Sequence, residues 1–190
     1  GERQFKTPID EREGITFLGG FNHMPNIEAV LFLVEEVMPK VLASNPDIKL
    51  YVYGSKMPES ISKLETENIK MVGFAESLDD VFNNHKLFVA PLLSGAGIKG
   101  KVLEAMAYGT PSVVTDVAAE GTGLVNNVNA VITNNASDFA AAIVDLYSDN
   151  EKCQNFSEAT RILSADKFSR SSGLAKFREI FESVGLYTTR

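Results

Sequence analysis

The chain has 190 residues, of which 44% are hydrophobic, and this suits one compact domain with a sizeable core. Its 18 basic residues stand against 25 acidic ones, and the net charge of −7 argues against a general nucleic-acid-binding or anionic-membrane surface, so an anion site must be local. The single Cys153 excludes an internal disulfide framework and multi-cysteine metal sites, and no run is typical of a transmembrane segment, so we expect a cytoplasmic protein.

The chain begins with a polar segment and then alternates between strand-like and helix-like stretches. Residues 1–13 have no regular period, so we expect a linker or an expression remnant there, followed by one domain over 14–190. Apolar runs bounded by turn residues predict strands at 15–20, 48–53, 70–73, 87–91, 112–115 and, at an edge, 130–133. Helices are predicted at 27–42, 58–64, 78–84 and 98–108, with a helical C-terminus in three segments from 137 to about 185.

This alternation is typical of an α/β fold. We expect a Rossmann-like, doubly wound and mainly parallel sheet of about six strands, with helices on both faces and a helical C-terminus. Ligands of such sheets bind beyond the carboxyl ends of the strands, at the point where the strand order reverses. The loops that can meet at a site therefore follow residues 18, 53, 73, 91 and 115.

The stretch from 87 to 115 combines two predicted strands with a glycine-rich loop and a short helix. Gly95 and Gly97 leave the loop backbone free to approach a ligand. Lys99 and Lys101 fall in the first turn of the helix, where unpaired N–H groups and the macrodipole already present positive charge. A bound phosphate would make this placement favourable, so we predict an anion site at the helix start.

Glu104 is the only charged residue between positions 102 and 107 of this helix. The segment is apolar on most sides, so the carboxylate should be largely covered and in need of polar partners. One interpretation is an i,i+3 ion pair with Lys101, with the lysines reaching solvent. The functional interpretation places a diol against Glu104, one turn beyond a phosphate.

The residues of the central stretch form a specific pattern: Pro91, Gly95, Gly97, Lys99, Leu103-Glu104-Ala105-Met106-Ala107, Gly109, Pro111 and Val113-Val114-Thr115. Further motifs flank it in a consistent order: Gly19-Gly20, Pro25-Asn26, Val52-Tyr53-Gly54, Val72-Gly73-Phe74 and Glu120-Gly121. In these motifs, over about residues 14–185, the chain resembles the C-terminal donor-binding domain of GT-B-type retaining glycosyltransferases (glycosyl transferases group 1). That family uses nucleotide-diphosphate sugars.

The resemblance implies roles for the residues that match. The backbone of Gly95, Gly97 and Ile98 would hold the diphosphate, and Lys99 would add a positive charge. Glu104 would accept hydrogen bonds from both ribose hydroxyls, because two carboxylate oxygens suit a vicinal diol.

The first loop contributes to the same implied site. Gly19 and Gly20 would let the backbone approach the transferred sugar and its phosphate. Asn26 is expected to serve the start of the first helix, and His85 is expected to have a structural role and not to bind a ligand. Weaker candidates for contact with the donor are Phe74, Glu120 and Gly121 in the loops, Lys101 at the helix start, and His23, which could contact the donor or the acceptor.

The resemblance also implies a reaction and a domain arrangement. A glycosyl unit, typically a hexose, would pass from the nucleotide-diphosphate sugar to an acceptor hydroxyl with retention of configuration, without a metal or other cofactor. Positioning and stabilisation of the leaving diphosphate would supply most of the catalysis. The acceptor would bind a separate N-terminal domain, so this chain alone should bind donor without turning it over.

Two departures from the family pattern affect the donor site. The family commonly has a second glutamate eight positions before the ribose-binding one, and this chain has Ala96 there. Many members place an arginine and a lysine after the first strand, whereas no basic residue occurs from 15 to 39. A subgroup with Pro-Asn after the first strand and Gly-Ala-Gly before the lysine shares both losses, so we interpret them as subfamily character.

Three other functions compete with this interpretation. An NAD-binding domain would need G-x-G-x-x-G after the first strand, and the sequence from Gly19 does not supply it. The run from Gly95 to Lys101 satisfies G-x-x-x-x-G-K, and Asp116 follows an apolar strand, but Val102 stands where a P-loop hydrolase needs Ser or Thr for magnesium. A noncatalytic nucleotide-binding or interaction module with the same fold remains the third alternative.

Overall fold

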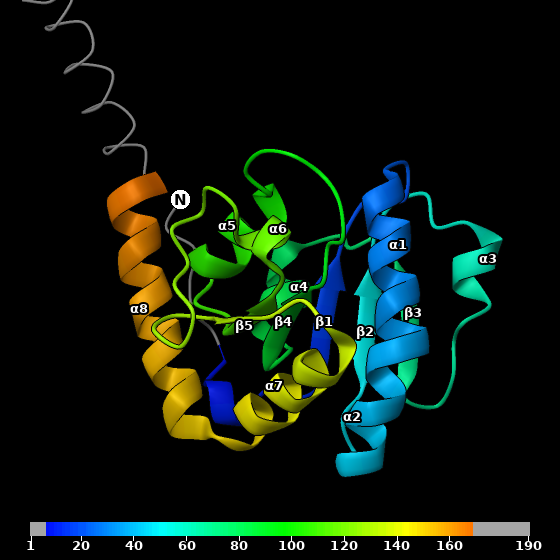
Figure 1. Cartoon of the computed structure of the whole chain (residues 1–190), viewed down its shortest axis with the longest axis horizontal. Coiled ribbons are helices and arrows are strands. Elements are labelled where there is room, and N and C mark those ends of the chain that lie inside the picture. The colour runs from blue at the N-terminus through cyan, green and yellow to red at the C-terminus, as the bar shows by residue number, and fades with distance from the viewer. Residues whose placement is uncertain (1–6, 169–190) are drawn as a thin grey trace, which may run out of the picture.

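A computed structural model describes residues 7–168. Its centre is a six-stranded sheet in the order β3-β2-β1-β4-β5-β6, and every pair of neighbouring strands is parallel (Figure 1). The strands are β1 (Ile15–Leu18), β2 (Leu50–Tyr53), β3 (Ile69–Gly73), β4 (Leu87–Ala90), β5 (Ser112–Val114) and β6 (Val131–Ile132). The predicted Rossmann-like fold, with its last strand at an edge, is confirmed.

Helices connect the strands and surround the sheet. They are η1 (Ile9–Glu11), α1 (Met24–Phe32), η2 (Leu33–Val37), α2 (Met38–Ser44), α3 (Glu59–Ser62), α4 (Leu78–Asn83), α5 (Gly100–Ala107), α6 (Asp116–Ala119), α7 (Ala136–Ser148) and α8 (Asn150–Phe168). Parallel crossovers are right-handed, so the reversal of strand order between β1 and β4 places α1 and α5 on opposite faces. Helix α2 packs against α7, and α5 packs against α8 (Figure 1).

The core forms where these layers meet the sheet. All four residues of β4 are fully buried, as expected for a parallel strand that is covered on both faces. Large aromatic side chains fill the space between sheet and helices; the fully buried ones are Phe17, Phe82, Phe88 and Phe139.

Several elements differ in extent from their predictions, and the reasons are local. Strand β1 ends at Leu18 because Gly19 and Gly20 belong to the loop, and α1 begins at Met24, earlier than expected, with a proline in its first turn. Helix α5 begins only at Gly100. Helix α6 was not predicted, because four residues are too few to show a helical period; the Thr115 hydroxyl caps it by accepting from the amide of Ala118. The predicted helix beyond residue 168 lies outside the described residues.

Residues 7–13 correct the expectation of an unpacked linker. Ile9 is buried, and the Arg12 guanidinium donates to the carbonyl of Phe82 at the end of α4, at 2.7 Å. The amide of Glu13 donates to the Asn84 carbonyl. The segment therefore packs as part of the domain, through one apolar residue and one arginine within an otherwise polar stretch.

Candidate functional site

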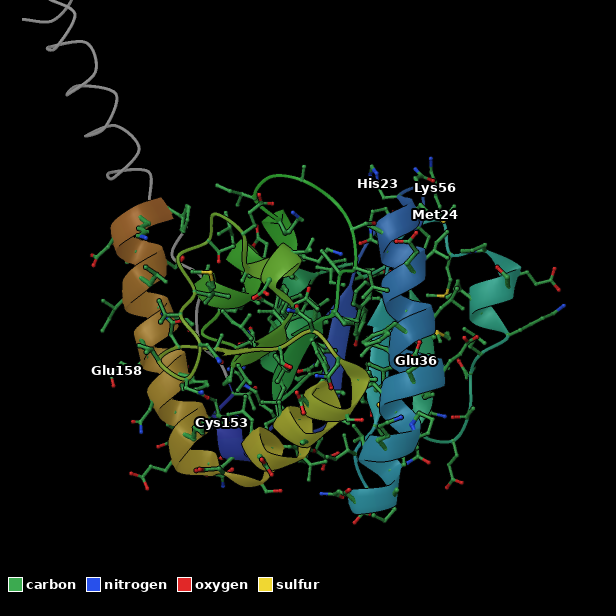
Figure 2. The ribbon with its side chains drawn as sticks, viewed as in Figure 1. His23, Met24, Glu36, Lys56, Cys153 and Glu158 are labelled. Carbon is green, nitrogen blue, oxygen red and sulfur yellow. The ribbon has the colours of Figure 1, made fainter. Side chains whose placement is uncertain are left out.

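The strand order reverses between β1 and β4, so the carboxyl ends of these two strands mark the expected ligand crevice. The loops 19–23 and 91–99 follow these strands. Figure 2 shows His23 and Met24, at the start of α1, at the same end of the molecule as Lys56 from the loop after β2. The predicted site residues from the first and central loops are therefore brought to one end of the sheet.

The loop after β1 is fixed against the loop after β2. The amide of Gly19 donates to the Tyr53 carbonyl at 2.9 Å, and that of Phe21 to the Ser55 carbonyl at 3.0 Å. A Cβ atom on Gly54 would overlap the carbonyl oxygen of Gly19, so the two backbones touch. This side of the crevice is therefore built from closely packed backbone.

Asn26 joins this loop to α5, a connection that its assignment to the helix start did not anticipate. The residue is 7% exposed, and its Nδ2 donates to the Gly20 carbonyl at 2.7 Å. Its Oδ1 accepts from the ammonium of Lys101. A Cβ on Gly19 would lie 2.7 Å from Asn26 Cγ and 2.9 Å from Lys101 Nζ, so a glycine makes room for this pair.

Lys101 places a partly buried cation beside the loop after β1. Its Nζ lies 4.6 Å from the centroid of the Phe17 ring in β1. Within residues 7–168 it makes no ion pair with Glu104 or another carboxylate, so the predicted alternative of an i,i+3 pair is wrong. Burial, together with the nearby charge of Lys99, lowers the pKa of Lys101 to about 8. A buried cation without a carboxylate favours the binding of an anion.

Lys99 connects the loops after β4 and β5. Its ammonium donates to the Gly97 carbonyl and lies 3.6 Å from Oε2 of Glu120. A Cβ on Gly121 would lie 2.7 Å from Cγ1 of Ile98. The structure thus brings these four predicted residues together: Ile98, Lys99, Glu120 and Gly121.

The glycine loop differs from the first loop in its packing. Gly95 has a φ of +117° and Gly97 a φ of +75°, so both adopt backbone conformations that favour glycine. A Cβ on Gly97 would meet no atom within 4 Å. The loop is exposed, and the Ser94 hydroxyl joins it to α1 by donating to Glu28 at 2.9 Å.

Glu104 lies one turn into α5 and is half-buried, with its Oε2 shielded from solvent. The expectation of a largely covered carboxylate is therefore met in part. Its position on the helix that begins at the glycine loop is the one predicted for a ribose-binding residue.

The remaining candidates lie at the edge of the site or away from it. His23 is exposed at the start of α1, and Phe74, after β3, is 73% exposed. His85 is structural, as expected: its Nε2 bonds the Tyr53 hydroxyl at 2.9 Å and its Nδ1 the Glu13 carbonyl at 3.0 Å. Burial lowers the pKa of His85, which suits a neutral ring that donates from Nδ1 and accepts at Nε2.

The sequence analysis missed the linking role of Asn26. The available signal was an asparagine beside Pro25 at a helix start, shortly after two glycines, in a loop without basic residues. Such an asparagine can bond the loop that precedes its own helix and still present its oxygen to a distant cation.

The chain matches the family described as "Glycosyl transferases group 1" over residues 12–149. A curated protein of Klebsiella pneumoniae, "Uncharacterized 44.6 kDa protein in cps region", is 30% identical over 145 residues, which are 72% of this chain and 37% of that protein. The chain thus spans little more than a third of the length of this relative.

Solved structures share the fold. A point mutant of TarM from S. aureus, in complex with fondaparinux, α-GlcNAc-glycerol and UDP, superposes with a TM-score of 0.76 at 21% identity, over 93% of this chain and 37% of that one. The C-terminal domain of a glycosyl transferase group 1 family protein (LpcC) from Francisella tularensis superposes with a TM-score of 0.66 at 17% identity, over 85% of this chain and 90% of that one.

No helix in the described part of the chain has the length and apolar character needed to cross a bilayer. From the family match and the GT-B-type fold, this chain belongs to the glycosyl transferases group 1 family.

Proposed function

We propose that this chain is the donor-binding, C-terminal domain of a cytoplasmic two-domain retaining glycosyltransferase of the hexosyltransferase type. Its substrate is a nucleotide-diphosphate sugar, and the acceptor binds an N-terminal domain of the same polypeptide. The observation that carries the proposal is the pair of lysines at the start of α5, at the switch point of the sheet. One of them, Lys101, is partly buried and, among residues 7–168, not paired with a carboxylate. The UDP bound by TarM supports a nucleotide donor.

Different residues bind different parts of the donor. The glycine loop and the first amides of α5 hold the diphosphate, with Lys99 and Lys101 supplying charge in place of a metal. Glu104 accepts from the ribose hydroxyls. Because Ala96 offers no carboxylate to the sugar, the backbone of the loop after β1 takes a larger part in its recognition.

Catalysis on this side of the enzyme is electrostatic. The leaving diphosphate gains negative charge as the glycosidic bond breaks, and preorganised cations and amides stabilise that charge. Acceptor positioning comes from the N-terminal domain, so the chain alone binds donor without transferring the sugar.

A thermal-shift panel tests donor binding directly. UDP-, GDP-, ADP- and dTDP-glucose are added to the chain in EDTA, and a ligand at ten times its Kd should stabilise the domain by about 1.4 kcal/mol, or roughly 3 to 6 °C. The matched control is Lys101→Met, which should respond less to the same ligand. A flat panel at millimolar ligand would contradict donor binding, and magnesium-dependent ATP hydrolysis would favour the P-loop alternative.

A transfer assay tests the domain arrangement. The chain alone should transfer no sugar to any acceptor. A polypeptide that also carries the N-terminal domain should transfer it. Turnover by the 190 residues alone would contradict the division of the site. Donor binding without turnover by the extended protein would favour the noncatalytic module.

A further inference from the structure

The ammonium of a covered lysine usually pairs with a carboxylate, but the partner of the Lys101 ammonium is an amide oxygen. Its ammonium donates to Asn26 Oδ1 and faces the Phe17 ring. Both partners favour a cation while leaving its charge uncompensated, since neither carries a full negative charge. The cation therefore remains available to a ligand.

The same amide group fixes the loop that borders the crevice. Asn26 Nδ2 donates to the Gly20 carbonyl, and Asn26 is nine-tenths buried, so its two ends are held in one orientation. Oδ1 must then point at Lys101 whenever Nδ2 bonds Gly20. The amide couples the position of the cation to the conformation of the loop.

We propose that Asn26 is a positioning residue that holds the Lys101 ammonium against the Gly19–Gly20 loop, where it faces the phosphates of the donor. The proposal rests on the proposed function for the identity of the ligand. It adds a residue that contacts no substrate and that acts through Lys101. An asparagine serves here where an aspartate would not, because a carboxylate would neutralise the cation before the donor arrives.

The proposal predicts a specific dependence on pH. Burial lowers the pKa of Lys101 most, and within residues 7–168 the charge of Lys99 lowers it further. A diphosphate raises the pKa of Lys101 on binding, so donor affinity should fall as the pH rises above about 8, by up to about tenfold per pH unit.

The experiment compares two substitutions with opposite electrostatic effects. Asn26→Leu keeps the shape but removes both hydrogen bonds, and Asn26→Asp keeps an acceptor but adds a negative charge. The titration of Lys101 is followed by NMR of isotope-labelled lysine, with its signal identified by its loss in Lys101→Met. Donor affinity is measured by calorimetry with the nucleotide sugar that stabilises the wild-type chain most.

The expected results differ in sign. Asn26→Leu should lower the pKa of Lys101, because the charged form loses its acceptor, and Asn26→Asp should raise it. Both should weaken donor binding, by about 10- to 100-fold. The matched control is Asn68→Leu, which removes a comparable amide-to-carbonyl bond, from Asn68 Nδ2 to Pro46 at 2.9 Å, outside the crevice. It should change neither quantity.

Two results would overturn the proposal. One is a Lys101 titration in Asn26→Leu that matches the wild type, and the other is a donor affinity unchanged in both Asn26 variants. If no nucleotide sugar binds the wild-type chain, the proposed function fails instead. The response of the Lys101 titration to Asn26 then still decides whether Asn26 positions the cation.

Discussion

The neighbouring glycines of the first loop should respond differently to the same substitution. An alanine Cβ at Gly19 would lie 2.7 Å from Cγ of Asn26 and 2.9 Å from Nζ of Lys101, closer than side-chain carbons approach other atoms. Asn26 cannot swing away, because it is buried and bonded to Gly20. At Gly20 the nearest atom to such a Cβ is the Ser55 hydroxyl oxygen at 3.5 Å, an ordinary contact.

The structure gives the magnitude of the difference. Overpacking costs about 1 to 3 kcal/mol, and removing a glycine from the unfolded chain returns about 0.4 to 1 kcal/mol where the backbone allows alanine. Neither glycine has a positive φ. Gly19→Ala should therefore lower the free energy of unfolding by about 1 to 2 kcal/mol, and Tm by roughly 2 to 8 °C. Gly20→Ala should be neutral or slightly stabilising.

Urea denaturation of both variants beside the wild type measures these free energies. An equal m-value in all three proteins would show that the substitutions change the free energy of unfolding without changing the compactness of the unfolded state. If Gly19→Ala were as stable as Gly20→Ala, the packing of Asn26 and Lys101 against Gly19 would be refuted.

Three further predictions concern single side chains. Glu104→Gln should weaken donor binding by about 1.5 to 3 kcal/mol while stability barely changes, and a ligand without ribose hydroxyls should bind both proteins equally in calorimetry; a persistent gap would mean that Glu104 has another role. Burial lowers the pKa of His85, so as the pH falls below about 6.5 the unfolded chain binds the proton before the folded one does. The free energy of unfolding should therefore fall more steeply with pH in the wild type than in His85→Gln. Parallel curves of unfolding free energy against pH would count against a buried neutral ring. Cys153 is fully buried and burial raises its pKa to about 11, so a thiol reagent at pH 8 should modify the chain only after denaturation, and rapid labelling of the native protein would contradict that burial.

The strands could be predicted because each is a short apolar run between turn residues, a signal that depends on neighbours in sequence. The contact between Asn26 and Lys101 could not, because it joins residues 75 positions apart and exists only once the strand order has reversed at β1 and β4. The site residues of the central loop were predictable as a motif, whereas the role of Lys101 required its burial to be known.

The first long helix shows a second limit of sequence periodicity. A single helix was predicted over 27–42, and the chain is indeed helical there, but it widens into the π-helical turn η2 before α2. Pro39 has no N–H to donate to the preceding turn, and a π turn accommodates that missing bond. Hydrophobic spacing does not distinguish the two helix types over so few residues.

The two sides of the crevice differ in how much conformational freedom they have to lose. The loop after β1 is bonded to the loop after β2 through Gly19 and Phe21, and its backbone is in contact with Gly54. The exposed glycines at 95 and 97 have open space or only loose contacts around them. When a ligand binds, the loop after β4 therefore loses most of the conformational entropy, and each residue that becomes fixed there costs about 1 to 2 kcal/mol. Substitutions that stiffen the glycine loop in its bound form are thus a route to tighter binding that leaves the geometry of the rigid side unchanged.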